Sequence, residues 1–359
     1  MVAASVESIR ETSPAAMRSR PVLETLVAVV LSIVAGSVVL LITGHDPVEV
    51  YRALIERAVL RPAGLEETVV RATPLMITGV AVLIAVRAGI WNIGIDGQVL
   101  VAALAAAVAA ALVTDAGRPV VWLTATVAGL VAGAAWALPA ALLRARFGVN
   151  EIVTTIMFNY VALFLTAWLV KGPLRDRSVV SPQTELIPRE LRLVSLGDTR
   201  THAGIIVALV LVVLVGWALR RTVAGLELRV VGENPRAAAV ALIPVRAYLF
   251  GALVVSGAVG GLAGANDILS TKGTFQAEWD PGYGFTAFAL VFLARRSAWA
   301  LVPGALLLGM LAYGADVMPR AAGIDPAFFG VIEGTLLASL AAPVLIRGLL
   351  ARRTRKEVR

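Results

Sequence analysis

The sequence predicts an all-α integral membrane protein with about ten transmembrane segments, several of them short or broken. Of its 359 residues, 58% are apolar, and long runs without any charge recur along the whole chain. A soluble domain has no way to bury so much apolar surface. Some of the apolar runs are shorter than the roughly 20 residues that a membrane-spanning helix needs. We therefore expect a multi-helix membrane protein in which some helices are interrupted.

Ten apolar segments give the predicted spans, with a range of eight to eleven. They comprise residues 22–43, 73–87, 98–113, 119–143, 151–170, 203–219, 247–269, 284–294, 298–315 and 327–347. Segments 73–87, 98–113 and 284–294 fall below the spanning length, so we expect short, tilted or re-entrant helices there.

The membrane domain covers residues 22–347, between a polar tail (1–21) and a basic tail (348–359). Lys and Arg stay on the cytoplasmic side of a membrane, and most of the 32 such residues fall inside when the N-terminus is placed there. Both termini are therefore expected in the cytoplasm. The net charge of +8 reflects this orientation better than it reflects nucleic-acid binding. The first span has no A-x-A cleavage pattern after it, which favours an uncleaved helix.

Two external loops follow from this orientation, residues 44–72 and 171–202. The first contains YRALIERAVL, whose apolar residues recur at helical spacing. We expect a helix that lies on the membrane surface or caps the outer mouth of a pore. The second loop is rich in proline, at Pro173, Pro182 and Pro188, and has no strong periodicity. It is long enough to contact a partner protein.

Glycines in the seventh segment predict close helix packing, because small residues let helix backbones approach one another in lipid. Two overlapping patterns with a spacing of four are formed by Gly257, Gly260, Gly261 and Gly264. The fourth segment repeats the spacing at Gly129 and Gly133. The sequence does not identify the helix against which either pattern packs.

Several kinds of chemistry are excluded by what the chain lacks. It has no cysteine, which excludes disulfides, thiolate catalysis and cysteine metal sites. Its two histidines, His45 and His202, fall in predicted loops, so no histidine metal site is expected. No lysine stands in a G-x-x-x-x-G-K-[ST] pattern, so the chain has no phosphate-binding loop of its own. We expect no cofactor on this chain; ATP and Mg²⁺, if used, would be bound by a partner.

The stretch RAGIWNIGIDGQ, residues 87–98, places Asn92, Asp96 and Gln98 between two apolar runs. Water cannot satisfy backbone groups inside hydrocarbon, so a polar break at that depth must line a cavity or be buried in protein. Short, Gly-interrupted segments also indicate the substrate sites of transporters. A hairpin loop at the cytoplasmic surface is the alternative. We favour a stretch that dips back into the membrane, with these three residues along a substrate pathway.

The fifth segment begins with a second polar group, which consists of Asn150, Glu151, Thr154, Thr155 and Asn159. Glu151, Thr154 and Thr155 share one helical face, and polar residues in membrane helices usually face the bundle interior or an aqueous path. Asn150 and Glu151 are equally suited to capping the helix. For Thr155 and Asn159 we favour the substrate pathway.

Glu333 is an acidic residue inside the apolar string FFGVIEGTLLASL. A charge there is costly and needs a partner, water or a proton. The residue either lines the pathway, which we favour, or forms a structural pair with an arginine of another helix, or lies near the aqueous edge.

The predicted cytoplasmic loop 220–246 contains the string VGENPRAAAVA, in which Asn234 precedes Pro235. Proline is preorganised at the first position of a helix, so a short helix is predicted to begin there. A helix across the cytoplasmic face either docks a partner protein or is a plain connector.

Six strings in a fixed order carry a family resemblance: ETVVRATPLMITGVAV, RAGIWNIGIDGQ, GVNEIVTTIMFNY, KGPLRD, LRVVGENPRAAAVA and DPGYGF. With them the chain resembles the permease subunits of bacterial ATP-binding cassette (ABC) importers, in the branched-chain amino acid and simple-sugar permease group. Within that group it is most similar to the nucleoside-type permeases that work with basic-membrane-protein lipoproteins. The resemblance runs from the loop before Thr73 nearly to the C-terminus.

The resemblance implies an importer in the bacterial inner membrane. A second permease subunit, expected to be a different paralogue, would share the substrate pathway. Two ATPase subunits would lie beneath the pair, and an external substrate-binding lipoprotein would deliver the substrate. The string VGENPRAAAVA would be the coupling helix that seats in the ATPase surface, with Gly232, Glu233, Asn234 and Pro235 as coupling residues.

Three positions depart from the family pattern. Asp96 stands where Glu is usual, Leu242 replaces an expected Gly after the coupling helix, and Thr286 replaces an expected Asp after DPGYGF. Without that last acid, substrate contacts near the eighth segment cannot be carried over from the family.

We therefore expect the membrane subunit of an ATP-driven nucleoside importer, which is not itself an enzyme. A simple-sugar permease is the alternative, because neutral amides suit the hydroxyl groups of a sugar as well as the polar groups of a nucleoside. The rival from a different class is a secondary transporter driven by an ion gradient through Glu333.

Overall fold

The computed structural model describes residues 14–340, with side chains from Thr25 onward, and places them in two compact units. The larger unit is Arg57–Tyr313, and the smaller one holds the described residues on either side of it. The predicted tail 348–359, most of the predicted tail 1–21 and the end of the predicted span 327–347 lie outside the described residues.

Apolar helices occupy all ten of the predicted segments, which confirms the all-α membrane fold. In chain order they are α2 (Pro14–Ile42), α4 (Pro62–Arg87), α5 (Ile95–Ala111), α6 (Arg118–Phe147), α7 (Glu151–Lys171), α8 (Gly204–Arg221), α11 (Val245–Asp267), α12 (Tyr283–Leu293), α13 (Leu301–Ala322) and Ala327–Leu340. Within the described residues, seven are long and apolar enough to cross a membrane, whereas α5, α12 and Ala327–Leu340 are shorter.

The prediction that segment 73–87 is short was wrong. Helix α4 has 26 residues and begins at Pro62, where the missing N–H of proline costs nothing. Charges in its first turns concealed this start in the sequence. The carboxylates of Glu66 and Glu67 accept hydrogen bonds from the backbone N–H and the guanidinium of Arg200, both at 3.0 Å. Contacts with a distant loop therefore allow the charged turns to be helical.

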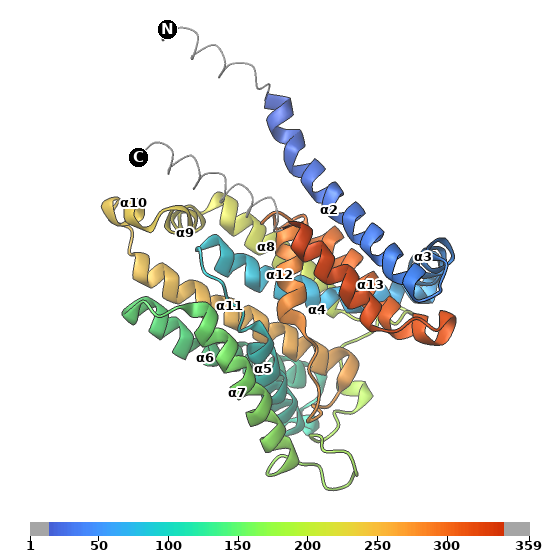
Figure 1. Cartoon of the computed structure of the whole chain (residues 1–359). Coiled ribbons are helices and arrows are strands. Elements are labelled where there is room, and N and C mark those ends of the chain that lie inside the picture. Colours follow the sequence, from blue (N-terminus) through green and yellow to red (C-terminus); the bar gives the residue numbers. More distant parts are fainter. Residues whose placement is uncertain (1–13, 341–359) are drawn as a thin grey trace, which may run out of the picture. The chain divides into compact units, whose positions relative to one another are not determined.

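Helix α11 lies at the centre of the larger unit and packs against α4, α5 and α6 (Figure 1). Its backbone touches that of α6 without intervening side chains. A Cβ on Gly261 would overlap the carbonyl oxygen of Gly129, and one on Gly133 would overlap Gly257. The glycine patterns of the fourth and seventh segments therefore pack on each other.

The other two glycines of the patterns in α11, Gly260 and Gly264, face α5 instead. A Cβ on Gly264 would lie 2.5 Å from the carbonyl oxygen of Val99, and one on Gly260 would lie 3.5 Å from Oε1 of Gln98. The two overlapping patterns thus give α11 two close-packing faces, one for each neighbouring helix.

The smaller unit contains α2, α3 (Pro47–Ile55), the end of α13 and Ala327–Leu340. The helix predicted within the loop 44–72 is α3 and the helical turn after it, and Asp46 caps α3 by accepting a hydrogen bond from the N–H of Val48 at 2.8 Å. Tyr51 of α3 donates its hydroxyl to the carbonyl of Ile33 in α2 at 2.9 Å. Its ring also lies 6.5 Å from that of Phe328, so α3 contacts both neighbouring helices of the unit.

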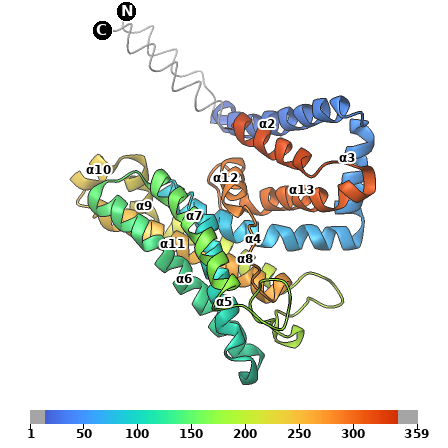
Figure 2. The same cartoon turned by 60° about the horizontal axis from the view of Figure 1, so that its bottom comes forward.

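The loop 171–202 is irregular, as predicted, and it lies against the segment that follows α11 (Figure 2). The N–H of Thr184 donates to the carbonyl of Phe275 at 3.0 Å, and that of Ile187 donates to Gly273 at 2.8 Å. Ile187 is fully buried. The loop therefore forms an ordered layer over one end of the larger unit.

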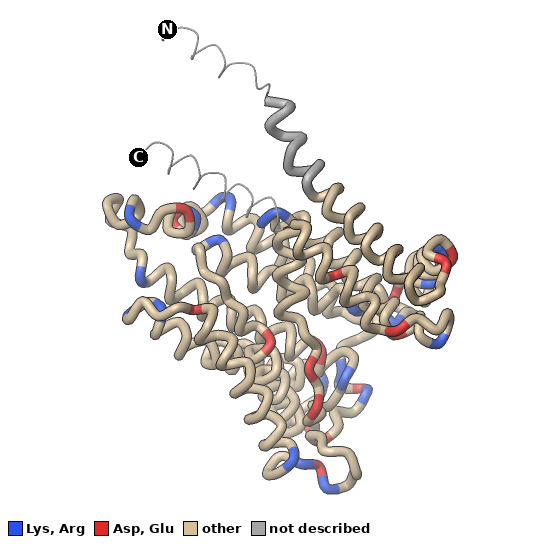
Figure 3. The backbone as a smooth tube through the Cα atoms, in the orientation of Figure 1, with Lys and Arg blue, Asp and Glu red and all other residues tan. Residues whose placement is uncertain are grey.

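Charged residues of the larger unit gather mainly at its two ends, and the tube between them is largely uncharged (Figure 3). One end carries the arginines of the predicted cytoplasmic loops, and we call it the arginine-rich end. It contains Arg87, Arg144, Arg146, Arg220, Arg221, Arg229, Arg236, Arg246, Arg295 and Arg296. This distribution is the one expected of a helix bundle that crosses a bilayer.

The contact between α6 and α11 gives a direct stability prediction. Gly261→Ala is expected to lower the free energy of unfolding by about 1–3 kcal/mol, because its methyl group would overlap the Gly129 carbonyl. Gly251→Ala in the same helix has nothing within 4 Å of the new Cβ and should not destabilise the protein. Thermal unfolding in detergent measures both variants, and equal melting temperatures would contradict the packing.

Candidate functional site

Residues 87–98, which join the end of α4 to the first turn of α5, run alongside α12 from one end of that helix to the other. Arg87 donates to the carbonyl of Arg296, just beyond the C-terminal end of α12. The ring of Trp91 stacks on Phe288, with ring centroids 5.9 Å apart. Oδ1 of Asp96 accepts a hydrogen bond of 2.6 Å from the N–H of Gly284, at the N-terminal end of α12.

An 11-residue helix such as α12 is about 16 Å long. The stretch therefore extends about that far from the arginine-rich end into the unit, where Asn92 is fully buried and Gln98 is 2% exposed. A hairpin at the surface does not have this geometry. The stretch enters the interior of the unit from the arginine-rich end, and we call residues 88–94 the break.

The amide of Asn92 in the break and the amide of Gln98 in α5 bind each other. Nδ2 of Asn92 donates to Oε1 of Gln98 at 3.0 Å, and Nε2 of Gln98 donates to Oδ1 of Asn92 at 3.1 Å. Asn92 also donates to Oγ of Ser256 at 2.9 Å, and Ser256 donates to the carbonyl of Ala81 at 2.7 Å. This network joins the break to α4, α5 and α11.

Asn159 supports the break from α7. Its Nδ2 donates to the carbonyl of Ile93 at 2.8 Å, and its Oδ1 accepts from the N–H of Gly97 at 2.9 Å. The N–H of Gly97 lies in the first turn of α5, where no helix carbonyl is available to accept it. Thr155 is buried one turn earlier and bonds its own helix, at the carbonyl of Glu151 (2.7 Å).

The start of α7 anchors the break at the arginine-rich end. Asn150 is the N-cap and accepts from the N–H of Ile152 at 2.9 Å. Glu151 is 6% exposed and lies 3.2 Å from Nε of Arg144, and it also accepts from the N–H of Trp91 at 3.4 Å. Of the two interpretations for this pair, the geometry favours capping and anchoring.

Two acids, the partly buried Asp96 and the buried Asp267, hold the first two residues of α12. Asp96 binds the N–H of Gly284, where a side chain would overlap its carboxyl group. Asp267, the last residue of α11, accepts the hydroxyl of Tyr283 at 2.6 Å. The first turns of α5 and α12 thus meet at Asp96, and a carboxylate is stabilised by the positive end of a helix dipole.

The sequence-based interpretation missed Asp267, Tyr283 and Ser256. The signal for the first was an acid at the end of a long apolar helix, and for the second a tyrosine in the family string DPGYGF. Glu333 lies in the smaller unit, partly exposed on Ala327–Leu340. The pathway roles of Asn92, Asp96, Gln98, Thr155, Asn159 and Glu333 stay predictions.

The predicted coupling loop forms two short helices, α9 (Val223–Glu233) and α10 (Pro235–Val240). Asn234 caps α10 by accepting from the N–H groups of Arg236 and Ala237, both at 3.1 Å, as its place before Pro235 predicted. Leu242 follows with a φ of +60°. This left-handed conformation explains why glycine is expected there, because glycine adopts it without strain.

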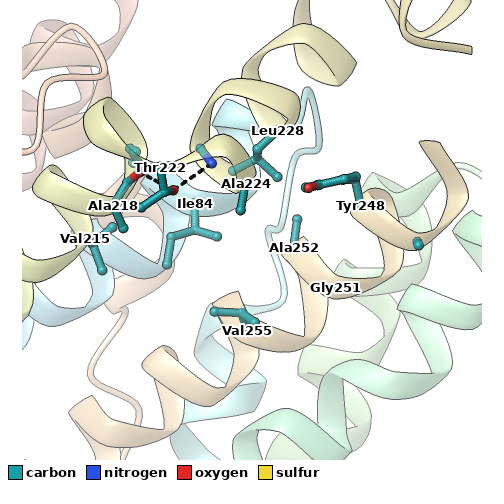
Figure 4. A pocket seen from close by; sticks show the side chains of 13 residues that line it. Ile84, Val215, Ala218, Thr222, Ala224, Leu228, Tyr248, Gly251, Ala252 and Val255 are labelled. Carbon is teal, nitrogen blue, oxygen red and sulfur yellow. Dashed lines mark hydrogen bonds between the residues drawn. The ribbon is translucent and has the colours of Figure 1, made fainter. Parts of the chain in front are cut away.

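A cavity of about 410 Å³ lies between α4, α8, α9 and α11 at the arginine-rich end (Figure 4). Ala224 and Leu228 of α9 lie across it from Ala252 and Val255 of α11. The lining is almost entirely apolar, and the hydroxyl of Tyr248 donates to Glu227 at 2.5 Å. None of the predicted pathway residues lines this cavity.

In this chain, continuous and interrupted helices meet at a polar break in the interior. This arrangement is typical of one class of protein, the multi-pass membrane transport proteins. Residues 64–340 match the family described as "Branched-chain amino acid transport system / permease component". The match covers well over half of the chain, and the chain belongs to this permease family.

Relatives with established names match nearly the whole chain. A glucose ABC transporter permease protein of Haloferax volcanii is 34% identical over 92% of this chain and 89% of its own length. A guanosine ABC transporter permease protein of Bacillus subtilis is 32% identical, over 92% and 96% respectively. A nucleoside ABC transporter permease protein of Lactococcus lactis subsp. cremoris is 29% identical, over 93% and 94%. Each organism has a second such permease that matches between 67% and 69% of this chain.

The reciprocal amide pair predicts non-additive mutations. Asn92→Ala and Gln98→Ala should each lower the free energy of unfolding by about 1–3 kcal/mol, because each leaves a buried amide unpaired. The double variant should lose less than the sum of the two, because neither partner remains. Denaturant unfolding in detergent measures the coupling, and strictly additive losses would show that the amides act independently.

Proposed function

We propose that this chain is the membrane subunit of an ABC importer that carries nucleosides. The observation that carries the proposal is the kind of polar group at the break. The amides of Asn92, Gln98 and Asn159 and the hydroxyl of Ser256 are neutral, and they are the groups that a substrate with hydroxyls and ring nitrogens would need. The names of the Bacillus and Lactococcus relatives support the same substrate class.

The position of Asp96 favours a neutral substrate over an amino acid. Half-helix N-termini inside transporters bind anionic groups of substrates. Here the chain places its own carboxylate at the N-terminus of α12, on the N–H of Gly284. The carboxylate of an amino acid would be repelled by Asp96 and would have to displace it. A nucleoside or a sugar brings no such charge.

In this mechanism, the break opens and the substrate replaces internal hydrogen bonds. Asn92 already uses both N–H groups and accepts two bonds, from Gln98 and from the N–H of Gly94. A substrate hydroxyl or ring nitrogen would take over one side of the Asn92–Gln98 pair. The exchange would cost little, because one net hydrogen bond contributes only about 0.5–1.5 kcal/mol.

The proposed energy source is a separate ABC ATPase with its own ATP and Mg²⁺. The end of α10 and the loop after it offer the ATPase an apolar contact, because Val240 is 85% exposed and Leu242 is 91% exposed. The second permeases of the three organisms support a paired partner subunit for this chain. An external binding lipoprotein completes the proposal, with both termini of the chain in the cytoplasm of a bacterial inner membrane.

The experiment must distinguish the nucleoside importer from two alternative functions. A simple-sugar permease is favoured by the Haloferax relative, whose name specifies glucose. An ion-coupled transporter working through Glu333 would need no ATPase at all.

Uptake of labelled guanosine by cells that express the complete transporter tests the proposal. We expect uptake that disappears without the ATPase subunit and that falls with excess unlabelled adenosine or uridine. Excess leucine or glucose should leave it unchanged. Full uptake without the ATPase would overturn the ATP-driven mechanism, and competition by glucose alone would identify the sugar permease instead.

A further inference from the structure

The last turn of α9 touches the backbone at the start of the break. Gly232 has no room for a side chain, since a Cβ there would overlap the carbonyl oxygen of Arg87 and lie 2.9 Å from the N of Gly89. A Cβ on Gly89 would in turn lie 3.0 Å from the carbonyl oxygen of Gly232. Gly89 has a φ of +75°, a conformation that favours glycine. Two glycines thus bring two backbones into direct contact.

This contact lies between the exposed coupling loop and the polar network. On one side, Gly232 is separated from the first residue of α10 by only Glu233 and the capping residue Asn234. On the other side, Gly89 stands three residues before Asn92. Ile90 between them is fully buried in a cluster that includes Leu228 of α9. A displacement of α9 therefore reaches Asn92 through packed atoms.

The two sides of α9 are packed very differently. Its end rests on residues 87–89, while Ala224 and Leu228 border the 410 Å³ cavity (Figure 4). Opposite them, Gly251 of α11 also borders the cavity and has nothing within 4 Å of its Cβ position. Packed interiors resist displacement, whereas a helix beside a cavity moves at less cost.

From these contacts we propose that α9 is a lever, and that the Gly232–Gly89 contact is the joint through which it moves the break. The lever turns toward α11 at the cavity while its end presses on residues 87–89. The joint changes the position of Asn92 relative to Gln98, and both glycines are positioning residues that need not touch substrate. This inference rests on the proposed function and specifies how ATPase movement reaches the substrate groups.

The test measures substrate imported per ATP hydrolysed in proteoliposomes that hold the complete transporter. Gly232 packs on residues 87–89, whereas the exposed contact offered to the ATPase is Val240 and Leu242, so Gly232→Ala should still copurify with the ATPase and still hydrolyse ATP. Its imported substrate per ATP should fall roughly tenfold, which is within the usual range for coupling between two sites. Gly334→Ala, in a helix position with nothing within 4 Å, is the matched control and should keep the wild-type ratio.

A second variant restricts α9 by filling the cavity beside it, and it serves as the test if Gly232→Ala fails to fold. Gly251→Leu places a large side chain in the cavity and should lower the same ratio, with assembly and hydrolysis retained. If either folded variant keeps the wild-type amount of substrate imported per ATP hydrolysed, the lever is overturned. This includes the case in which uptake and ATP hydrolysis both fall in proportion. Failure of the wild-type chain to copurify with the ATPase would refute the proposed function itself.

Discussion

The backbone of the break has to satisfy its hydrogen bonds without water, and much of the larger unit is arranged around this constraint. Residues 88–94 form no helix. The end of α4 and local turns pair some of their N–H groups, and the other N–H and C=O groups need partners from elsewhere. Asn159 takes the carbonyl of Ile93 and the N–H of Gly97, and Glu151 takes the N–H of Trp91. Without α7 beside it, the break would lose these partners.

The same polar groups that hold the break together are the ones proposed to bind substrate. This double role is physically consistent, because an exchange of one hydrogen-bond partner for another changes the free energy little. Asp96 contributes differently, since it fixes the N-terminus of α12 and keeps an anion at the meeting point of two helices. A neutral, polar substrate follows from that arrangement more readily than a charged one does.

Local signals in the sequence predicted the helices and the break, and distant contacts account for what they missed. Apolar runs located all ten helices, and Asn234 before Pro235 located α10. The start of α4 was missed because Glu66 and Glu67 are paired with Arg200, more than 130 residues away. The glycine spacing of α11 predicted close packing, but only the fold shows which neighbour each glycine meets. The hydrogen bond that Gly284 donates to Asp96 joins positions 188 residues apart, and no local pattern reveals it.

The central claim, that the break changes its packing during transport, is tested most directly by cysteine accessibility. The chain has no cysteine, so a single Ile93→Cys reports only on the break. The account predicts that its labelling by a water-soluble maleimide differs between the resting transporter and one trapped with ATP and vanadate. Val180→Cys, at a site that is 94% exposed, should label equally in both states. Identical labelling of Ile93→Cys in the two states would contradict the account.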